Sequence, residues 1–274
     1  MPMERNGKIQ AEEQDSMKKS YEIDMCSGPI LGKILIFSIP LMLSGILQLL
    51  FNAADVIVVG RYAGSQSLAA VGSTTALINL LINIFVGLSV GVNVLVAQYY
   101  GAKSDGDVSE TIHTAITLGL VSGLFLVAVG IVAARPLLEL MGTPDDVINK
   151  STIYMQIYFA GMPVTMLYNF GSAVLRAVGD TRRPLYFLTA AGVVNVLLNL
   201  VFVIYFNLDV AGVALATVAA QAISAALVLK SLLSAEGCLK LKIHELKISK
   251  VKLKRIARVG LPAGMQGAIF SISN

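Results

Sequence analysis

One carboxylate, Asp55, lies towards the end of a long apolar stretch and is the residue best placed to do chemistry. Gln48 and Asn52 precede it by seven and three residues, so the three side chains share one face of a helix. A carboxylate near the middle of a membrane-spanning helix is unfavourable by about 2.5–3.5 kcal/mol, which makes function its default interpretation. We predict that this face lines a polar cavity with Asp55 as its titratable group.

Two amides and a hydroxyl are the next candidates. Asn195 and Asn199 are four residues apart in a later apolar stretch, and Thr217 lies midway along the one that follows. Amides facing lipid are unfavourable unless they are hydrogen-bonded. Their structural interpretation is hydrogen bonding between helices, worth about 0.6–2 kcal/mol per contact.

The elements that position these residues are membrane-spanning helices. The chain has 274 residues, 55% hydrophobic and 14% charged, with a mean hydropathy of +0.74, whereas soluble domains carry about 25% charged residues. Uncharged stretches long enough to span a bilayer occur at 34–54, 62–102, 111–134, 151–175, 184–208 and 210–229. We predict an all-α polytopic membrane protein with a lobe of six transmembrane helices. Pro40 is expected to kink the first helix, and Gly161 with Pro163 the fourth.

The distribution of Lys and Arg predicts the orientation. If the N-terminus is cytoplasmic, all but three of the 21 Lys and Arg lie on the cytoplasmic side, as the positive-inside rule requires. We predict a multi-pass protein of the plasma (inner) membrane, with 1–30 as a cytoplasmic tail, 31–234 as the lobe and 235–258 as a basic cytoplasmic linker. Cys26 and Cys238 then lie in cytoplasmic segments and imply no disulfide framework.

The opening of the first helix repeats after the linker. Arg255 precedes Pro262 by seven residues, as Lys33 precedes Pro40. Parallel six-helix repeats are a common plan of transporters, so we expect 259–274 to begin a seventh helix and the chain to hold one lobe and the start of a second. The linker interleaves basic and aliphatic residues, which suits either contact with anionic headgroups or a solvated loop.

Other polar and small residues of the spans have mainly structural interpretations. Asn79 and Asn83 either extend the cavity or pair with a neighbouring helix. Gly87 and Gly91 are expected to allow close helix packing. His113, at the cytoplasmic start of the third span, is expected to meet solvent.

Four motifs, in order along the chain, resemble those of the multidrug and toxic compound extrusion (MATE) transporters of bacterial type. They are NAADVIVVGRYAGSQSLAAVG (52–72), GLSVGVNVLVAQYYGAK (87–103), RAVGDTRRP (176–184) and NVLLNLVFVIYFNLDVAGVALAT (195–217). The resemblance implies a secondary active multidrug efflux transporter that exports amphipathic, mainly cationic compounds in exchange for H⁺ or Na⁺. It also implies a monomer when full length, in a lipid bilayer, with no cofactor and no nucleic acid partner.

The same resemblance assigns roles to residues. Asp55 would be the ion-coupling carboxylate, in a hydrogen-bonding network with Asn195, Asn199 and Thr217. Some proton-coupled members carry a second acid at the position of Asn199, and its absence here leaves the coupling ion open. Oxygens of Asp55 and Asn199 would be ligands if the ion is Na⁺, whereas a lone desolvated Asp55 suits H⁺.

Gln48 and Asn52 would line the cavity beside this network. In some members a bend at the proline that matches Pro40 is linked to protonation of the acid, and a static kink is the structural alternative.

Three other functions fit the sequence less well. A lipid-linked oligosaccharide flippase of the same superfamily would carry basic residues within its spans to face a pyrophosphate, and these spans carry none. A membrane-embedded enzyme needs a nucleophile with a base, a carboxylate pair or metal ligands, and one acid does not supply them. A channel needs no coupled acid. An exporter that is not an enzyme is therefore favoured.

Overall fold

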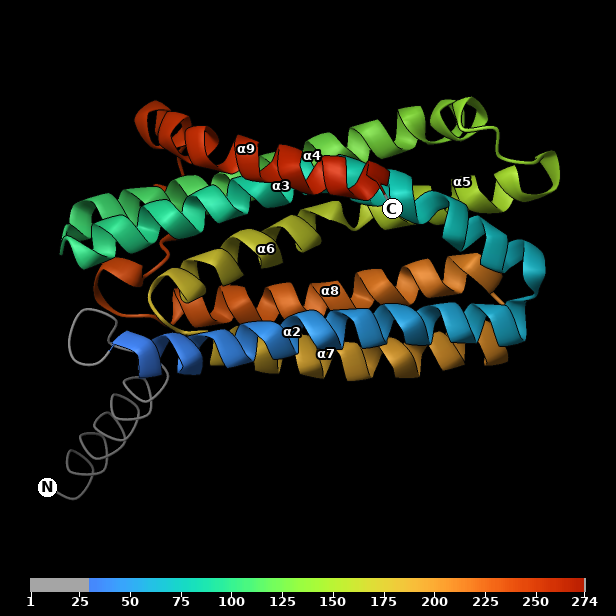
Figure 1. Cartoon of the computed structure of the whole chain (residues 1–274), viewed down its shortest axis with the longest axis horizontal. Helices are drawn as coiled ribbons and strands as arrows, with labels where there is room; N and C mark the ends of the chain where they lie inside the picture. Colours follow the sequence, from blue (N-terminus) through green and yellow to red (C-terminus); the bar gives the residue numbers. More distant parts are fainter. Residues whose placement is uncertain (1–29, 274) are drawn as a thin grey trace, which may run out of the picture.

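The computed structural model describes residues 30–273, and this part of the chain is a bundle of helices without strands (Figure 1). The predicted tail, with Cys26, lies almost wholly outside the described residues. Five of the described helices are long and apolar enough to span a membrane, which confirms the predicted fold class. The elements are α2 (Ile30–Val58) with the π-helical η1 (Val59–Ala63), α3 (Ser65–Gly101), α4 (Asp105–Leu140), α5 (Asp145–Ala160), α6 (Met162–Ala177), α7 (Arg182–Leu200) with the π-helical η2 (Val201–Tyr205), α8 (Asp209–Leu233), the 3₁₀ turns η3 (Gly237–Leu239) and η4 (Ile243–Glu245), and α9 (Lys250–Ser273).

The fourth predicted span is two helices, α5 and α6, of 16 residues each. They meet at Gly161, and Pro163 lies in the first turn of α6, where its missing N–H leaves no helical bond unmade. The kink that was expected in this span is therefore an interruption at Gly161 between two shorter helices. Pro40, by contrast, lies inside α2, which remains helical through it.

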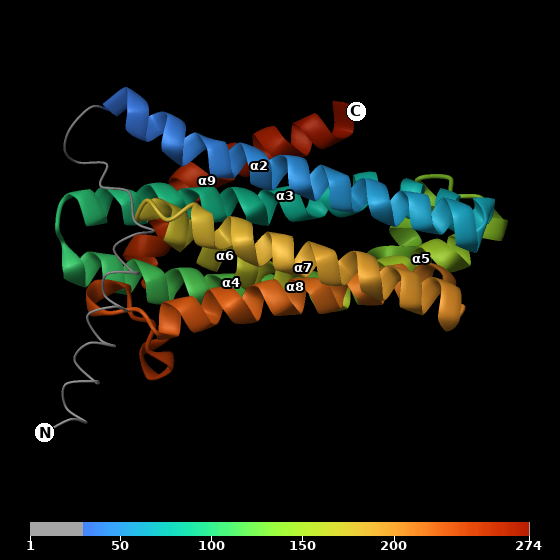
Figure 2. The ribbon, with the colours of Figure 1, turned by 90° about the horizontal axis from the view of Figure 1, so that it is seen from below.

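Successive helices run back and forth, so the turns gather at two ends, as the view turned by 90° in Figure 2 also shows. The end at the left of Figure 1 holds the α3–α4 turn, the α6–α7 turn and the segment between α8 and α9. We call it the basic end, because it carries Lys103, Arg182, Lys230 and the cations of the linker. At the α6–α7 turn, Gly179 adopts a positive φ of 89°, the left-handed conformation that ends many helices.

Helix α9 packs along α3 with almost no space between the two backbones. A Cβ on Gly87 would lie 2.2 Å from Gly264 Cα, and one on Gly91 would lie 2.3 Å from the carbonyl oxygen of Ile256. The close packing predicted for these α3 glycines is confirmed, and we call this contact the glycine seam. Helix α9 begins at Lys250, so the last third of the predicted linker is helical.

The expectation for His113 was wrong. Its side chain is buried, with only 2% of the residue's surface exposed. Its Nε2 accepts a hydrogen bond from the backbone N–H of Lys242 at 3.1 Å, and its Nδ1 lies 2.7 Å from the carbonyl oxygen of Ser109. The linker folds over the start of α4 and covers the ring, a tertiary contact that the local sequence does not indicate.

Candidate ion and substrate site

Asp55 lies on the side of α2 that faces α7. Its Oδ1 accepts a hydrogen bond from Nδ2 of Asn199, which is fully buried. Helix α2 can come this close because Gly192 of α7 has no side chain: a Cβ there would lie 1.9 Å from the ring of Phe51. Phe51 precedes Asp55 by one helical turn, so the same contact positions the carboxylate.

The four residues predicted to form the ion-coupling network are joined by hydrogen bonds. Asn199 Nδ2 also donates to Asn195 Oδ1 at 3.3 Å, and Asn195 Nδ2 donates to Thr217 Oγ1 at 3.3 Å. The Thr217 hydroxyl in turn donates to the carbonyl oxygen of Val213 at 3.0 Å. The chain of bonds thus crosses from α2 through α7 to α8, and the structure brings Asp55, Asn195, Asn199 and Thr217 together.

A cavity of about 310 Å³ lies between α2, α3, α5, α6, α7 and α8, and Asp55, Asn195 and Thr217 of this network line it. Gln48 and Asn52 line it, as predicted from their spacing with Asp55. Among the described residues that line it, Asp55 is the one carboxylate, and there is no Lys, Arg or His. The cavity therefore offers one negative charge in a neutral polar surrounding.

Several lining residues were not predicted. They are mainly polar residues of α5, α6 and α8: Tyr158, Thr165, Tyr168, Asn169, Gln221 and Ser224. Gln221 and Ser224 follow Thr217 by four and seven residues, the spacing by which the α2 stripe was found, so this signal was present in the sequence. Gln221 Oε1 and Ser224 Oγ have no hydrogen-bond partner within the described chain and remain available to a ligand.

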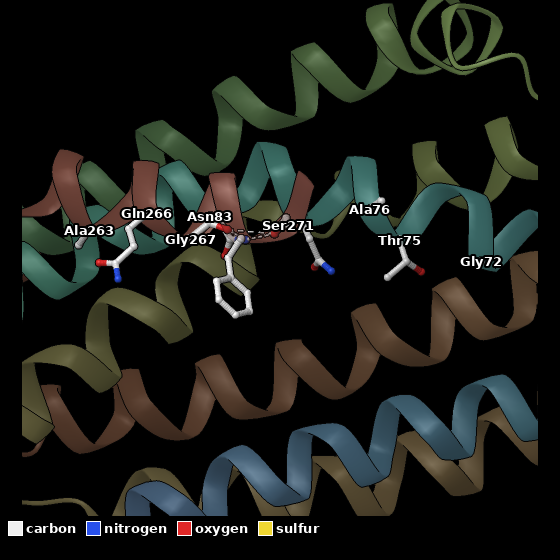
Figure 3. Close-up of a pocket in the computed structure, with 10 residues that line it drawn as sticks. Gly72, Thr75, Ala76, Asn83, Ala263, Gln266, Gly267 and Ser271 are labelled. Carbon is white, nitrogen blue, oxygen red and sulfur yellow. Dashed lines mark hydrogen bonds between the residues drawn. The ribbon is translucent and has the colours of Figure 1, made fainter. Parts of the chain in front are cut away.

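A second, more open cleft of about 710 Å³ lies between α3 and α9 (Figure 3). Asn79 and Asn83 line both this cleft and the Asp55 cavity. Asn83 Nδ2 donates to Ser271 Oγ at 2.7 Å and to the carbonyl oxygen of Gly267 at 3.2 Å, both on α9. Asn83 therefore both extends the cavity and pairs with a neighbouring helix.

Pro40 lies outside this site. It precedes Asp55 by 15 residues, or roughly 22 Å along a helix. The Ser44 hydroxyl donates to the carbonyl oxygen of Pro40 at 2.8 Å, the back-bonding that serine makes within helices. A role for this proline in a bend of α2 stays a prediction.

The donor set suits either predicted ion. Asn199 Oδ1 is buried and has no hydrogen-bond partner among the described residues, so the amide that donates to the Asp55 carboxylate also carries an unpaired oxygen. Carboxylate and amide oxygens are ligands of hard cations, and a carboxylate alone accepts a proton.

A bundle of spanning helices around a polar cavity that is lined by one half-buried acid is typical of secondary transporters. The MatE family model matches residues 40–201. The chain belongs to the MatE family, as its motifs predicted, and this membership confirms a transporter family and not an enzyme family.

Relatives and solved structures agree with this membership. The chain is 32% identical to the probable multidrug resistance protein YoeA of Bacillus subtilis, over 87% of this chain and 53% of that protein. It is 26% identical to an FAD transporter of Shewanella oneidensis, over 91% of this chain and 56% of the relative. The crystal structure of MATE in the bent conformation superposes with a TM-score of 0.82 at 26% identity, over 88% of this chain and 54% of that one. The chain thus spans about half the length of the proteins it matches.

Proposed function

We propose that this chain supplies the first lobe of a secondary active exporter of amphipathic, mainly cationic compounds, driven by inward movement of H⁺ or Na⁺. The observation that carries the proposal is the half-buried Asp55 carboxylate, which faces the cavity without a basic partner among the described lining residues. An organic cation and the coupling ion would compete for this one charge. Binding of the ion from outside would then lower the affinity for the organic cation and release it.

An anionic substrate fits the cavity less well. One relative is named an FAD transporter, and a dinucleotide carries negative phosphates. A cavity with one acid and no base among its described lining residues would repel them. The same argument disfavours a lipid-linked pyrophosphate, so cationic substrates remain the proposal.

The proposed orientation places the basic end in the cytoplasm and the protein in the plasma membrane. It is supported by the excess of Lys and Arg at that end, the asymmetry that sets topology in short loops. Full-length monomers would then close the cavity alternately towards the two sides by movement of one lobe against the other.

Binding of a fluorescent organic cation, ethidium, to the purified chain tests the site directly. We expect Asp55→Asn to weaken binding at least tenfold and to remove its dependence on pH or Na⁺, because the variant keeps the shape of the side chain and loses its charge. Asp145→Asn, at an exposed acid outside the cavity, is the matched control and should bind as the wild type does.

Equal ethidium affinity for the wild type and Asp55→Asn would refute the assigned role of Asp55. For the full-length protein in vesicles, uphill ethidium uptake under an imposed pH gradient or an imposed Na⁺ gradient would identify the coupling ion. Uptake that only runs downhill under both gradients would instead indicate a channel.

A further inference from the structure

The start of α9 carries a stripe of exposed cations that the proposed transport cycle does not use. Lys250, Lys254 and Arg258 follow one another at intervals of four residues and are exposed, so they share one face of the helix. Together with Val251 and Arg255 they line an open hollow of about 360 Å³. We call these three cations the α9 stripe.

The nearby carboxylates do not neutralise the stripe, because another lysine occupies them. Lys252 points the opposite way, towards α4, with 5% of its side chain exposed. It forms ion pairs with Asp107 and with Glu110, and its Nζ lies 4.0 Å from the centre of the Tyr99 ring. Within the described part of the chain, the cations of the α9 stripe form no ion pair. Their charge is directed outwards and is uncompensated there.

The depth of the stripe places it at a membrane surface. Helix α3 ends with Tyr99 and Tyr100, and Arg255 donates to the Tyr99 hydroxyl at 2.6 Å. Tyrosines are enriched at the level of lipid headgroups. Lys250 and Arg258 are roughly 12 Å apart along the helix. One headgroup layer is roughly 5–7 Å thick, so the long side chains at the two ends of the stripe must extend along the helix towards it.

Exposed aliphatic residues accompany the cations. Val251 is 62% exposed beside the stripe, and Ile248 just before the helix is 38% exposed. Cations with interleaved aliphatic side chains are typical of segments that lie at the boundary between headgroups and acyl chains. Exposed apolar side chains would not stabilise a stripe that contacts water alone.

We propose that the α9 stripe is a docking surface for the phosphate headgroups of anionic phospholipids in the leaflet at the basic end. Lys250, Lys254 and Arg258 pair with lipid phosphates, and Val251 contacts the acyl boundary. The site depends on the proposed orientation only for the name of the leaflet, and it is independent of Asp55.

The test is lipid binding by the purified chain in a neutral detergent, measured by native mass spectrometry with phosphatidylglycerol and with phosphatidylcholine. We expect the wild type to prefer phosphatidylglycerol. The triple variant Lys250→Gln/Lys254→Gln/Arg258→Gln should lose roughly 100-fold in phosphatidylglycerol affinity, about fivefold for each cation. Binding of phosphatidylcholine should not change.

A control with the same loss of charge is available at the same end of the bundle. Lys103→Gln/Arg182→Gln/Lys230→Gln removes three exposed cations outside the stripe and should bind phosphatidylglycerol as the wild type does. The charge-retaining variant Lys250→Arg/Lys254→Arg/Arg258→Lys should also bind, which separates loss of charge from loss of fold.

Three results would overturn the proposal. Equal affinity of the two triple Gln variants would show that total charge, not the stripe, attracts the lipid. A wild type with no preference for phosphatidylglycerol would show that another partner covers this face. Inorganic phosphate that displaces the lipid at equal concentration would assign a site for a soluble anion.

Discussion

The glycine seam gives a sharp prediction for Gly87→Ala. The new Cβ would lie 2.2 Å from Gly264 Cα and N, and 2.6 Å from the carbonyl oxygen of Gly260. Carbon atoms in contact are about 3.5–4.0 Å apart, so α3 and α9 must separate by roughly 1.3 Å or more. All three obstacles are backbone atoms, which cannot rotate away as a side chain can.

We expect Gly87→Ala to destabilise the chain by about 1–3 kcal/mol, the usual effect of overpacking. Gly72→Ala is the matched control on the same helix, because a Cβ there meets nothing within 4 Å. It should stabilise by about 0.5–1 kcal/mol, because alanine loses less backbone entropy in a helix than glycine.

The assay is unfolding of the purified chain in detergent, with hydrogen exchange of the α9 amides as a local measurement. Gly87→Ala should lower the free energy of unfolding and speed exchange along α9, whereas Gly72→Ala should do neither. If the two variants unfold alike and α9 exchanges at the wild-type rate in both, α9 does not pack on α3 as described.

Two further predictions concern the contacts that hold the linker and the start of α9. Lys252→Gln should destabilise the chain by about 1–3 kcal/mol. This is less than the loss of one partner of a fully buried ion pair, because Asp107 keeps 42% of its side chain exposed. The control Lys247→Gln, at an exposed lysine nearby, should have no effect on the unfolding midpoint. Burial alone would lower the pKa of Lys252, but its hydrogen bonds to Asp107 and Tyr99 raise it above the ordinary 10.5. While Asp107 is ionised, this stabilisation is therefore present up to pH 10.5 and is lost as the pH rises through the raised value. A Lys252→Gln difference that is absent between about pH 6 and pH 10 would contradict this. His113→Ala should destabilise the chain by about 1 kcal/mol and speed hydrogen exchange of the Lys242 amide, because this backbone N–H loses its acceptor. His113→Gln can restore an acceptor. Unchanged exchange of the Lys242 amide in both variants would show that the linker does not pack on the His113 ring.

The length of uncharged stretches was enough to predict the helices, because a spanning segment must satisfy its own backbone and exclude charge over a fixed thickness. The same criterion cannot detect a break that uses uncharged residues. Gly161 and Pro163 interrupt the fourth span without adding a charge, so the stretch still reads as continuous. The sequence therefore predicted one kinked helix at Gly161 and Pro163, where the structure has two helices.

The site was predictable where a charge marked it. The charge of Asp55 identified one face of its helix as polar, and the spacing of Gln48 and Asn52 from Asp55 placed them on the same face. The same spacing occurs on α8 at Thr217, Gln221 and Ser224, where no charged residue marks it. Of these three residues only Thr217 was predicted, because the family resemblance pointed to it. Tyr158 and Tyr168 enter the cavity from the two halves of the broken span, and their position depends on the angle between α5 and α6, which no local pattern encodes.

Asn83 connects the two parts of the molecule on which a transport cycle would act. Its amide lies in the wall of the Asp55 cavity, while both of its hydrogen bonds go to α9. The glycine seam holds α9 against α3 along the same stretch. Any separation of these helices therefore removes two acceptors from a half-buried amide group that faces the cavity. A fully buried amide without a partner is unfavourable by about 1–3 kcal/mol, so the cost for Asn83 is at most of this size until the amide finds another partner. Movement of α9 and the polarity of the cavity are thus coupled through one side chain.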